Sequence, residues 1–121
     1  DLLRKEPEYQ DASSFNAGPK IILGKPEDSA GKIFVDMTGG TEGSKDIFAR
    51  LSQAGIKTLV CMHLSEEHFK KVQTEYLNVI IAGHIASDNL GLNLLLDKIE
   101  KKNKLDIIAC SGFRRFKHLW A

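Results

Sequence analysis

Residues 79–88 read V-I-I-A-G-H-I-A-S-D and place an imidazole and a carboxylate four positions apart, at His84 and Asp88. The apolar run predicts a short strand that ends near Gly83, with a helix starting soon after it. Ligands gather at the carboxyl ends of strands in open α/β sheets, and these two side-chain types bind divalent transition metals. The run therefore predicts two ligands of a metal site, which usually takes three or four from protein.

A second loop of this kind reads M-H-L-S-E-E-H and holds His63, Glu67 and His68. His63 leaves a predicted strand, whereas Glu67 and His68 fall in the first turn of the next helix. If this strand neighbours the one before His84, the two loops could share one coordination sphere or its surroundings. The alternative stays open, because histidines in a charged loop are more often solvated surface residues and His84 could pack beneath the sheet.

A third loop, D-M-T-G-G-T-E-G-S, carries Gly39, Gly40 and Gly43 between a strand and a helix. Glycines let the backbone approach a ligand closely, and free amides at a helix start favour anions. The spacing matches neither the dinucleotide fingerprint nor the phosphate loop with its lysine. Tight-turn geometry is therefore favoured over phosphate binding, and both interpretations stay open.

Strands alternate with helices along most of the chain, which predicts βαβ units. The fold class we expect is α/β in three layers, with a mostly parallel or mixed sheet and helices on both faces. The first two strands are expected to form a hairpin, and Ser87 is expected to cap the last helix, an apolar one. The predicted strands are Lys20–Leu23, 32–37, 58–62, 78–82, 105–109 and an edge strand at 113–117; the predicted helices begin near residues 44, 66 and 87.

Length and composition suit one globular domain of a cytoplasmic protein. The chain has 121 residues, a hydrophobic share of 42% and a formal charge of +1, so no bulk field argues for nucleic acid or membrane binding. Residues 1–19 are expected to be a lead-in or linker segment and residues 20–121 a single α/β domain. The chain begins at Asp1 rather than methionine, which suggests a piece of a longer protein.

Together, these motifs resemble a known family. The runs D-M-T-G-G-T-E-G-S-K, M-H-L-S-E-E-H, N-V-I-I-A-G-H-I-A-S-D-N-L-G-L-N-L-L-L-D and C-S-G-F-R-R are similar to the C-terminal half of an NGG-one-interacting-factor-three (Nif three-like) protein, often described as a GTP cyclohydrolase type-two homologue. The resemblance implies a two-half α/β protein that holds a pair of divalent metal ions, such as zinc, iron or manganese, between its halves. It also implies a homo-oligomer for the full-length protein.

Carried over by position, the resemblance implies that His84 and Asp88 are the metal ligands of this half. Asp88 shortens the reach by one methylene relative to the glutamate that is commoner in the family. His68 matches a histidine close to the metals or the substrate, and His63, which has no secure counterpart, is kept as a fourth candidate. The ligands of the other half are absent, so the chain resembles half of a dinuclear site.

The resemblance therefore implies a metal-dependent hydrolase acting on a phosphate ester or nucleotide-like molecule when full length, with the isolated chain inactive. One alternative is a non-catalytic oligomeric scaffold or binding module, whose oligomers would persist after chelation. A weaker alternative is a nucleotide-binding domain that uses the glycine loop without metal. Thermal stabilisation by a nucleotide would then be insensitive to a chelator.

Overall fold

The computed structural model describes residues 1–38 and 42–120. They form two compact units, which we call the α4 unit (Asp1–Gly18 with Ile85–Ala121) and the sheet unit (Pro19–His84). In chain order the elements are η1 (Leu3–Lys5), α1 (Pro7–Ser14), β1 (Lys20–Leu23), β2 (Lys32–Asp36), α2 (Ile47–Gln53), β3 (Ile56–Cys61), α3 (Glu66–Thr74), β4 (Asn78–Ile81) and α4 (His84–Glu100).

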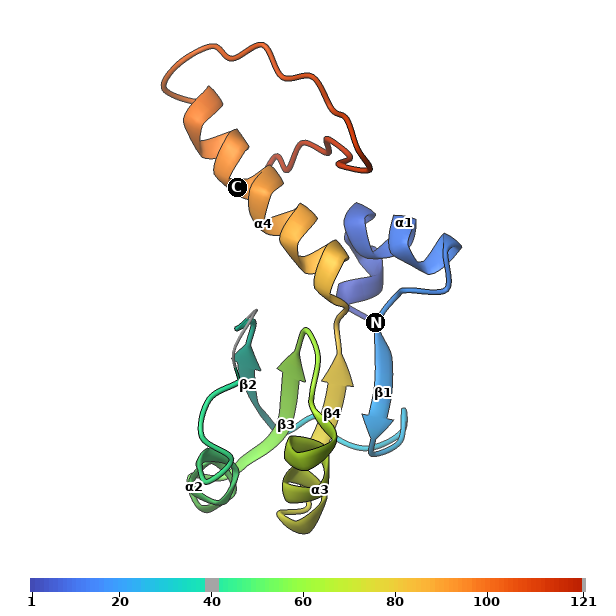
Figure 1. The fold of residues 1–121 in the computed structure, drawn as a ribbon, viewed down its shortest axis with the longest axis vertical. Helices are drawn as coiled ribbons and strands as arrows, with labels where there is room; N and C mark the ends of the chain where they lie inside the picture. The colour runs from blue at the N-terminus through green and yellow to red at the C-terminus, as the bar shows by residue number, and fades with distance from the viewer. Residues whose placement is uncertain (39–41, 121) are drawn as a thin grey trace. The chain divides into compact units, whose positions relative to one another are not determined.

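The sheet unit contains a mixed four-stranded sheet in the order β1-β4-β3-β2. β2, β3 and β4 run parallel, and β1 pairs antiparallel with β4 (Figure 1). The predicted α/β class and mixed sheet are thus confirmed. The predicted hairpin is wrong, because β1 and β2 lie at opposite edges of the sheet: β1 takes up the free edge of β4, and β2 that of β3.

Local sequence signals explain where the helices of this unit begin and end. Ser65 caps α3, since its side-chain oxygen accepts a hydrogen bond from the backbone N–H of His68 at 3.2 Å. Glu66 and Glu67 follow in the first turn, where the helix dipole favours negative charge. After α2, Gly55 adopts a φ of +79°, which closes the helix and lets the chain turn directly into β3.

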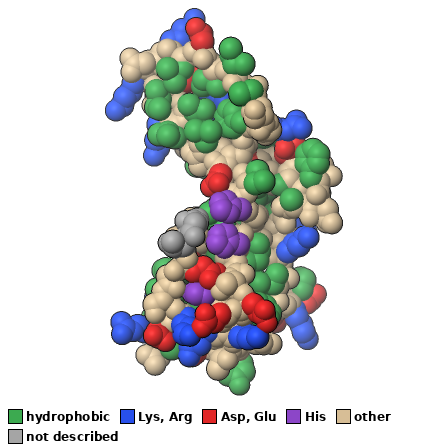
Figure 2. Space-filling model, in the orientation of Figure 1, with side chains coloured by type: hydrophobic (Ala, Val, Ile, Leu, Met, Phe, Trp, Pro, Cys, Tyr) green, Lys and Arg blue, Asp and Glu red, His purple; other side chains and the backbone are tan. Residues whose placement is uncertain are grey.

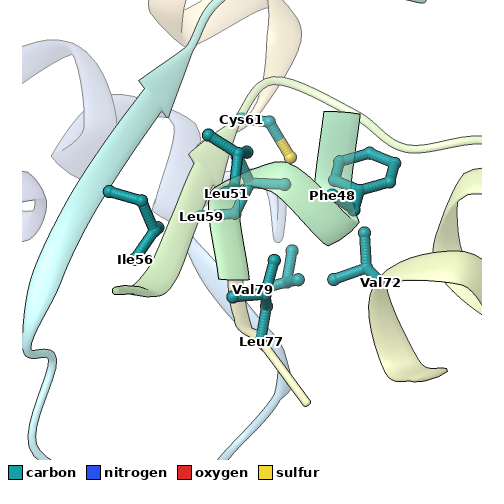
Figure 3. Packing of buried hydrophobic residues seen from close by; sticks show 8 residues of the cluster. All are labelled: Phe48, Leu51, Ile56, Leu59, Cys61, Val72, Leu77 and Val79. Carbon is teal, nitrogen blue, oxygen red and sulfur yellow. The ribbon is translucent and has the colours of Figure 1, made fainter. Parts of the chain in front are cut away.

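Two helices of the sheet unit cover one face of the sheet with apolar side chains (Figure 3). Leu59 of β3 and Val79 of β4 point toward these helices and are at most 2% exposed. The other members of this core come from α2, α3, β3 and the turn before β4: Phe48, Leu51, Ile56, Cys61, Val72 and Leu77. Close packing of these side chains fixes where the carboxyl ends of the parallel strands lie.

The α4 unit holds together differently, by pairing one helix with an extended segment. The side chains of Asn89, Asn93 and Asp97 are spaced by four and so share one face of α4. These side chains bond to the backbone of residues 114, 116 and 118, and a spacing of two residues is typical of an extended chain. Asn89 both donates to and accepts from the backbone of Arg114. Asn93 accepts from the Phe116 N–H, and Asp97 accepts from the His118 N–H.

These bonds explain two corrections to the sequence prediction. The expected strands at 105–109 and 113–117 are not present, because the backbone groups of the second segment bond to α4 side chains rather than to a strand. The helix also buries its polar stripe: Asn93 is 0% exposed, whereas Leu92 and Leu95 are exposed. No helix among the described residues has the length and apolar character needed to cross a membrane.

The segment predicted as a lead-in contains η1 and α1. Pro7 occupies the first turn of α1, where its missing N–H costs nothing. Tyr9 is 1% exposed, and its hydroxyl lies 3.0 Å from the side-chain oxygen of Ser87. The prediction that Ser87 caps the last helix is wrong, because α4 begins three residues earlier, at His84.

Candidate functional site

The loops after the parallel strands of the sheet unit leave from one edge of the sheet, as parallel topology requires. His63 follows β3, and His84 follows β4 as the first residue of α4. Because β3 and β4 are hydrogen-bonded neighbours, the two imidazoles meet: their ring centroids are 5.2 Å apart, and the rings are inclined by 27°. Figure 2 shows two adjacent histidine side chains on the face in view. The adjacency of strands that the sequence only suggested is confirmed.

Both rings of this histidine pair are accessible, since His63 and His84 are exposed residues. Exposed imidazoles can offer a nitrogen lone pair to an ion from solution. Asp88 follows His84 by four positions on α4, so the two residues stand one helical turn apart along the helix. Imidazole and carboxylate groups are both donor types that bind divalent transition metals.

The ring of His68 has contacts on both sides. Nε2 lies 2.8 Å from the backbone oxygen of Gly43, and Nδ1 lies 2.9 Å from a carboxylate oxygen of Glu42 and 2.9 Å from the hydroxyl of Ser65. The Gly43 carbonyl only accepts hydrogen bonds, so Nε2 donates to it, whereas Nδ1 faces both the Glu42 carboxylate and the Ser65 hydroxyl. Through these contacts His68, on α3, ties the loop after β2 to that helix.

Glu42 is a residue of this site that we did not single out from the sequence. One carboxylate oxygen accepts from the backbone N–H of Ser65, and the other faces His68. Desolvation works to raise the pKa of Glu42, but the hydrogen bonds from Ser65 and the nearby His68 and His63 hold it below its ordinary value. The available signal was its place in the glycine-rich loop, where an acid stands among small residues.

A cavity of about 60 Å³ opens beside this contact, large enough for a few water molecules or an ion. Its wall carries the carboxylates of Asp36 and Glu42 and the imidazoles of His63 and His68. Burial, together with the negative charges of Asp36 and Glu42, raises the pKa of the Cys61 thiol to about 12. The cavity therefore favours a cation over an anion.

The glycine loop gives little support to phosphate binding. Gly39 and Gly40 lie outside the described residues. The Gly43 carbonyl faces His68, and a side chain added at Gly43 would meet no atom of the described residues within 4 Å, so none of them requires a glycine there. Helix α2 has only seven residues and begins after Asp46, whose charge opposes an anion.

The described residues bring three metal-ligand atoms together elsewhere, in the α4 unit. Glu6, Glu8 and His118 each offer one ligand atom within 4.8 Å of the others. The four predicted residues, His63, His68, His84 and Asp88, form no such set within the described part of the chain. Sequence reasoning missed this cluster, since 110 positions separate Glu8 from His118 and no local pattern links them.

The fold of the chain is α/β with a mixed sheet. Imidazole side chains lie at the carboxyl ends of two of its parallel strands. A solved crystal structure of a NIF3 superfamily protein from Sphaerobacter thermophilus is similar to it, with a TM-score of 0.70 and 26% sequence identity. The alignment covers 93% of this chain and 40% of that protein. No protein-family model and no curated protein matches the chain.

The predicted resemblance to the NIF3 (NGG-one-interacting-factor-three) family is therefore confirmed. This chain spans about two fifths of the length of the NIF3 superfamily protein that it matches. A centre that takes ligands from a longer chain would be only partly present in these 121 residues.

Proposed function

We propose that this chain is one part of a divalent-metal-binding protein of the NIF3 type, and that His84, Asp88 and His63 supply its metal ligands. The observation that carries the proposal is the His63–His84 pair, two exposed imidazoles with ring centroids 5.2 Å apart at the ends of neighbouring strands. Imidazole and carboxylate donors suit zinc, iron or manganese. His68, on α3, contacts Gly43 and Glu42 of the loop after β2, and it stays a further candidate ligand.

The residues fit such an ion chemically, although they do not complete a site. Two imidazoles and one carboxylate are a donor set that transition metals accept, and a bound ion of this kind polarises a phosphoryl oxygen or activates a water. Within the chain, His63 and His84 would hold the ion, and the cavity carboxylates Asp36 and Glu42 would oppose the approach of anions from that side. A phosphate ester or nucleotide-like substrate would then have to reach the ion from the open side of the histidine pair.

We further propose that the longer protein hydrolyses such a substrate and that the isolated chain does not. A two-metal centre needs ligands to clamp both the attacking and the leaving oxygen, and this chain spans only 40% of the NIF3 protein that it matches. A second candidate function is a scaffold that assembles through the sheet unit. It is favoured by the exposure of Ile33 and Val35 on β2, at 48% and 58%.

The test is Zn²⁺ binding by the His84→Ala chain, measured by equilibrium dialysis against a competing chelator. The Glu8→Gln substitution is carried in every sample, so that the separate acidic cluster of the α4 unit does not contribute. We expect His84→Ala to weaken Zn²⁺ binding at least tenfold, since it removes a ligand. Ile85→Ala, the next residue on α4 and 83% exposed, is the matched control and should bind as before.

Equal binding by the two variants would remove the metal site from this loop. The scaffold interpretation would gain if sedimentation then showed oligomers that survive chelation. Failure of p-nitrophenyl phosphate hydrolysis by the metal-loaded longer protein would reject the hydrolase part of the proposal and leave the metal site standing.

A further inference from the structure

A second cluster of metal-binding side chains lies inside the α4 unit, and its ligands are buried. Glu8 is 2% exposed and His118 is 6% exposed, whereas Glu6 is half-buried. Nε2 of His118 lies 2.8 Å from Oε1 of Glu8, and Nδ1 lies 3.6 Å from Oε2 of Glu6. One imidazole thus faces two different carboxylates in a place largely closed to solvent.

An unsatisfied oxygen in the same cluster gives an independent sign of a missing ligand. Oε2 of Glu8 is fully buried and has no hydrogen-bond partner among the described residues. Its neighbour Oε1 is well served, because it receives hydrogen bonds from His118 and, at 2.8 Å, from the side-chain amide of Asn93. A buried carboxylate oxygen without a partner is costly, and a metal ion is one group that would satisfy it.

The charges around the cluster also favour a bound cation. Arg115 is committed to Asp97 and Glu100, and Lys117 also faces Glu100. The basic group that faces both Glu6 and Glu8 is His118. Even a protonated His118 would leave one negative charge in excess, whereas a divalent cation with a neutral imidazole balances both carboxylates.

Neighbouring groups hold two of the three side chains in place, as is common around metal ligands. The Asn93 amide, 0% exposed, fixes the Glu8 carboxylate and accepts in turn from the Phe116 N–H at 3.3 Å. The backbone N–H of His118 donates to Asp97 at 2.9 Å, and its ring packs edge-on against Trp120 with centroids 5.1 Å apart. These contacts arise from α4 and from the extended segment that lies along it.

We propose that Glu6, Glu8 and His118 form a binding site for a divalent transition-metal ion, with Zn²⁺ as the ion to test. One nitrogen and two carboxylate oxygens suit Zn²⁺ better than Ca²⁺ or Mg²⁺, which prefer all-oxygen sets. Zn²⁺ bonds of about 2.0–2.2 Å keep ligand atoms within roughly 4.4 Å of one another. The cluster, with its atoms within 4.8 Å, needs to close only slightly around the ion. The site is separate from the histidine pair of the sheet unit.

The experiment measures Zn²⁺ binding to the 121-residue chain carrying His63→Ala and His84→Ala, so that the histidine pair of the sheet unit cannot contribute. We expect one Zn²⁺ per chain in this background, and a rise in Tm when Zn²⁺ is added. Adding Glu8→Gln, which keeps the side-chain size, should weaken binding at least tenfold. Adding Glu66→Gln, an exposed acid paired with Lys70 on α3, is the matched control and should change nothing.

A further variant guards against misfolding of the buried position. Glu6 is half-buried, so Glu6→Gln should leave the fold intact, as judged by circular dichroism, and still weaken Zn²⁺ binding. Absence of binding in the background chain, or equal binding with Glu8→Gln and with Glu66→Gln, would overturn the proposal and leave Glu8 and His118 as a buried ion pair. Loss of binding with both Glu6→Gln and Glu8→Gln, but not with the control, supports it.

Discussion

The sheet unit and the α4 unit are stabilised by different interactions. In the sheet unit, backbone groups pair from strand to strand, and the buried side chains of the core are apolar, with Leu59 and Val79 at its centre. In the α4 unit, side chains of one helix satisfy the backbone of an extended segment, and the buried groups include Asn93 and Asp97. The stability gained by burying apolar side chains depends little on the exact packing, whereas a buried polar network loses stability for each member left without a partner.

The largest effect should come from opening a cavity in the apolar core. Leu59→Ala removes a side chain that is 2% exposed and should lower the free energy of unfolding of the sheet unit by about 3–5 kcal/mol. Regional amide hydrogen exchange measures this: protection in β3 and β4 should fall, while that in α4 is retained. Leu119→Ala, at a residue 99% exposed, is the control. Equal loss of protection in both units would show that they unfold together and would contradict the contrast.

The polar network of the α4 unit should be nearly as sensitive to a change that would be mild in an apolar core. Asn93→Leu keeps a similar volume but leaves the Phe116 N–H without its acceptor and deprives Glu8 of a donor. We expect a loss of about 2–3 kcal/mol from the α4 unit, because buried groups become unpaired. The loss would be read from exchange in α4, with Asn103→Leu, an exposed position, as control. A neutral outcome would mean that the network is not needed for stability.

The same contrast explains how much of the fold could be predicted from the sequence. β-branched and aliphatic runs between turn residues are a local signal, so β1 to β4, α2 and α3 were predicted close to their observed bounds. The 113–117 segment has a similar local pattern, but Asn89 and Asn93 on α4 bind its backbone instead of a strand. Such side-chain to backbone bonding over more than 20 residues leaves no periodic trace in the sequence.

Some contacts of the candidate site could be predicted from the sequence and others could not. His63 and His84 could be predicted to meet, since both follow strands and parallel topology brings strand ends together. The role of Glu42 could not, because it depends on where one loop places its carboxylate against Ser65 and His68. The Glu6, Glu8 and His118 cluster depends on a contact between the two ends of the chain, which spacing within a motif cannot reveal.

The smallest expected effect concerns the pKa of one carboxylate from each unit, Asp97 and Glu42. Burial alone would raise the pKa of Asp97, but hydrogen bonds from Arg115 and from the His118 N–H hold it below its ordinary value of 3.8. Hydrogen bonds likewise outweigh the desolvation of Glu42 and hold its pKa below 4.5. A folded-state pKa below the unfolded value gives stability that is present above the unfolded pKa and is lost as the pH falls through the folded pKa.

Each carboxylate accepts from one backbone amide, so the two losses can be followed separately by NMR. The His118 N–H reports on Asp97 and the Ser65 N–H on Glu42. Between pH 6 and pH 2 we expect each amide shift to titrate with a midpoint below the ordinary pKa of its carboxyl group. Asp97→Asn should abolish the step at His118 alone, and Glu42→Gln the step at Ser65 alone. A midpoint at or above pH 3.8 for the shift of the His118 backbone amide would show that the hydrogen bonds to Asp97 do not outweigh its burial in the folded α4 unit.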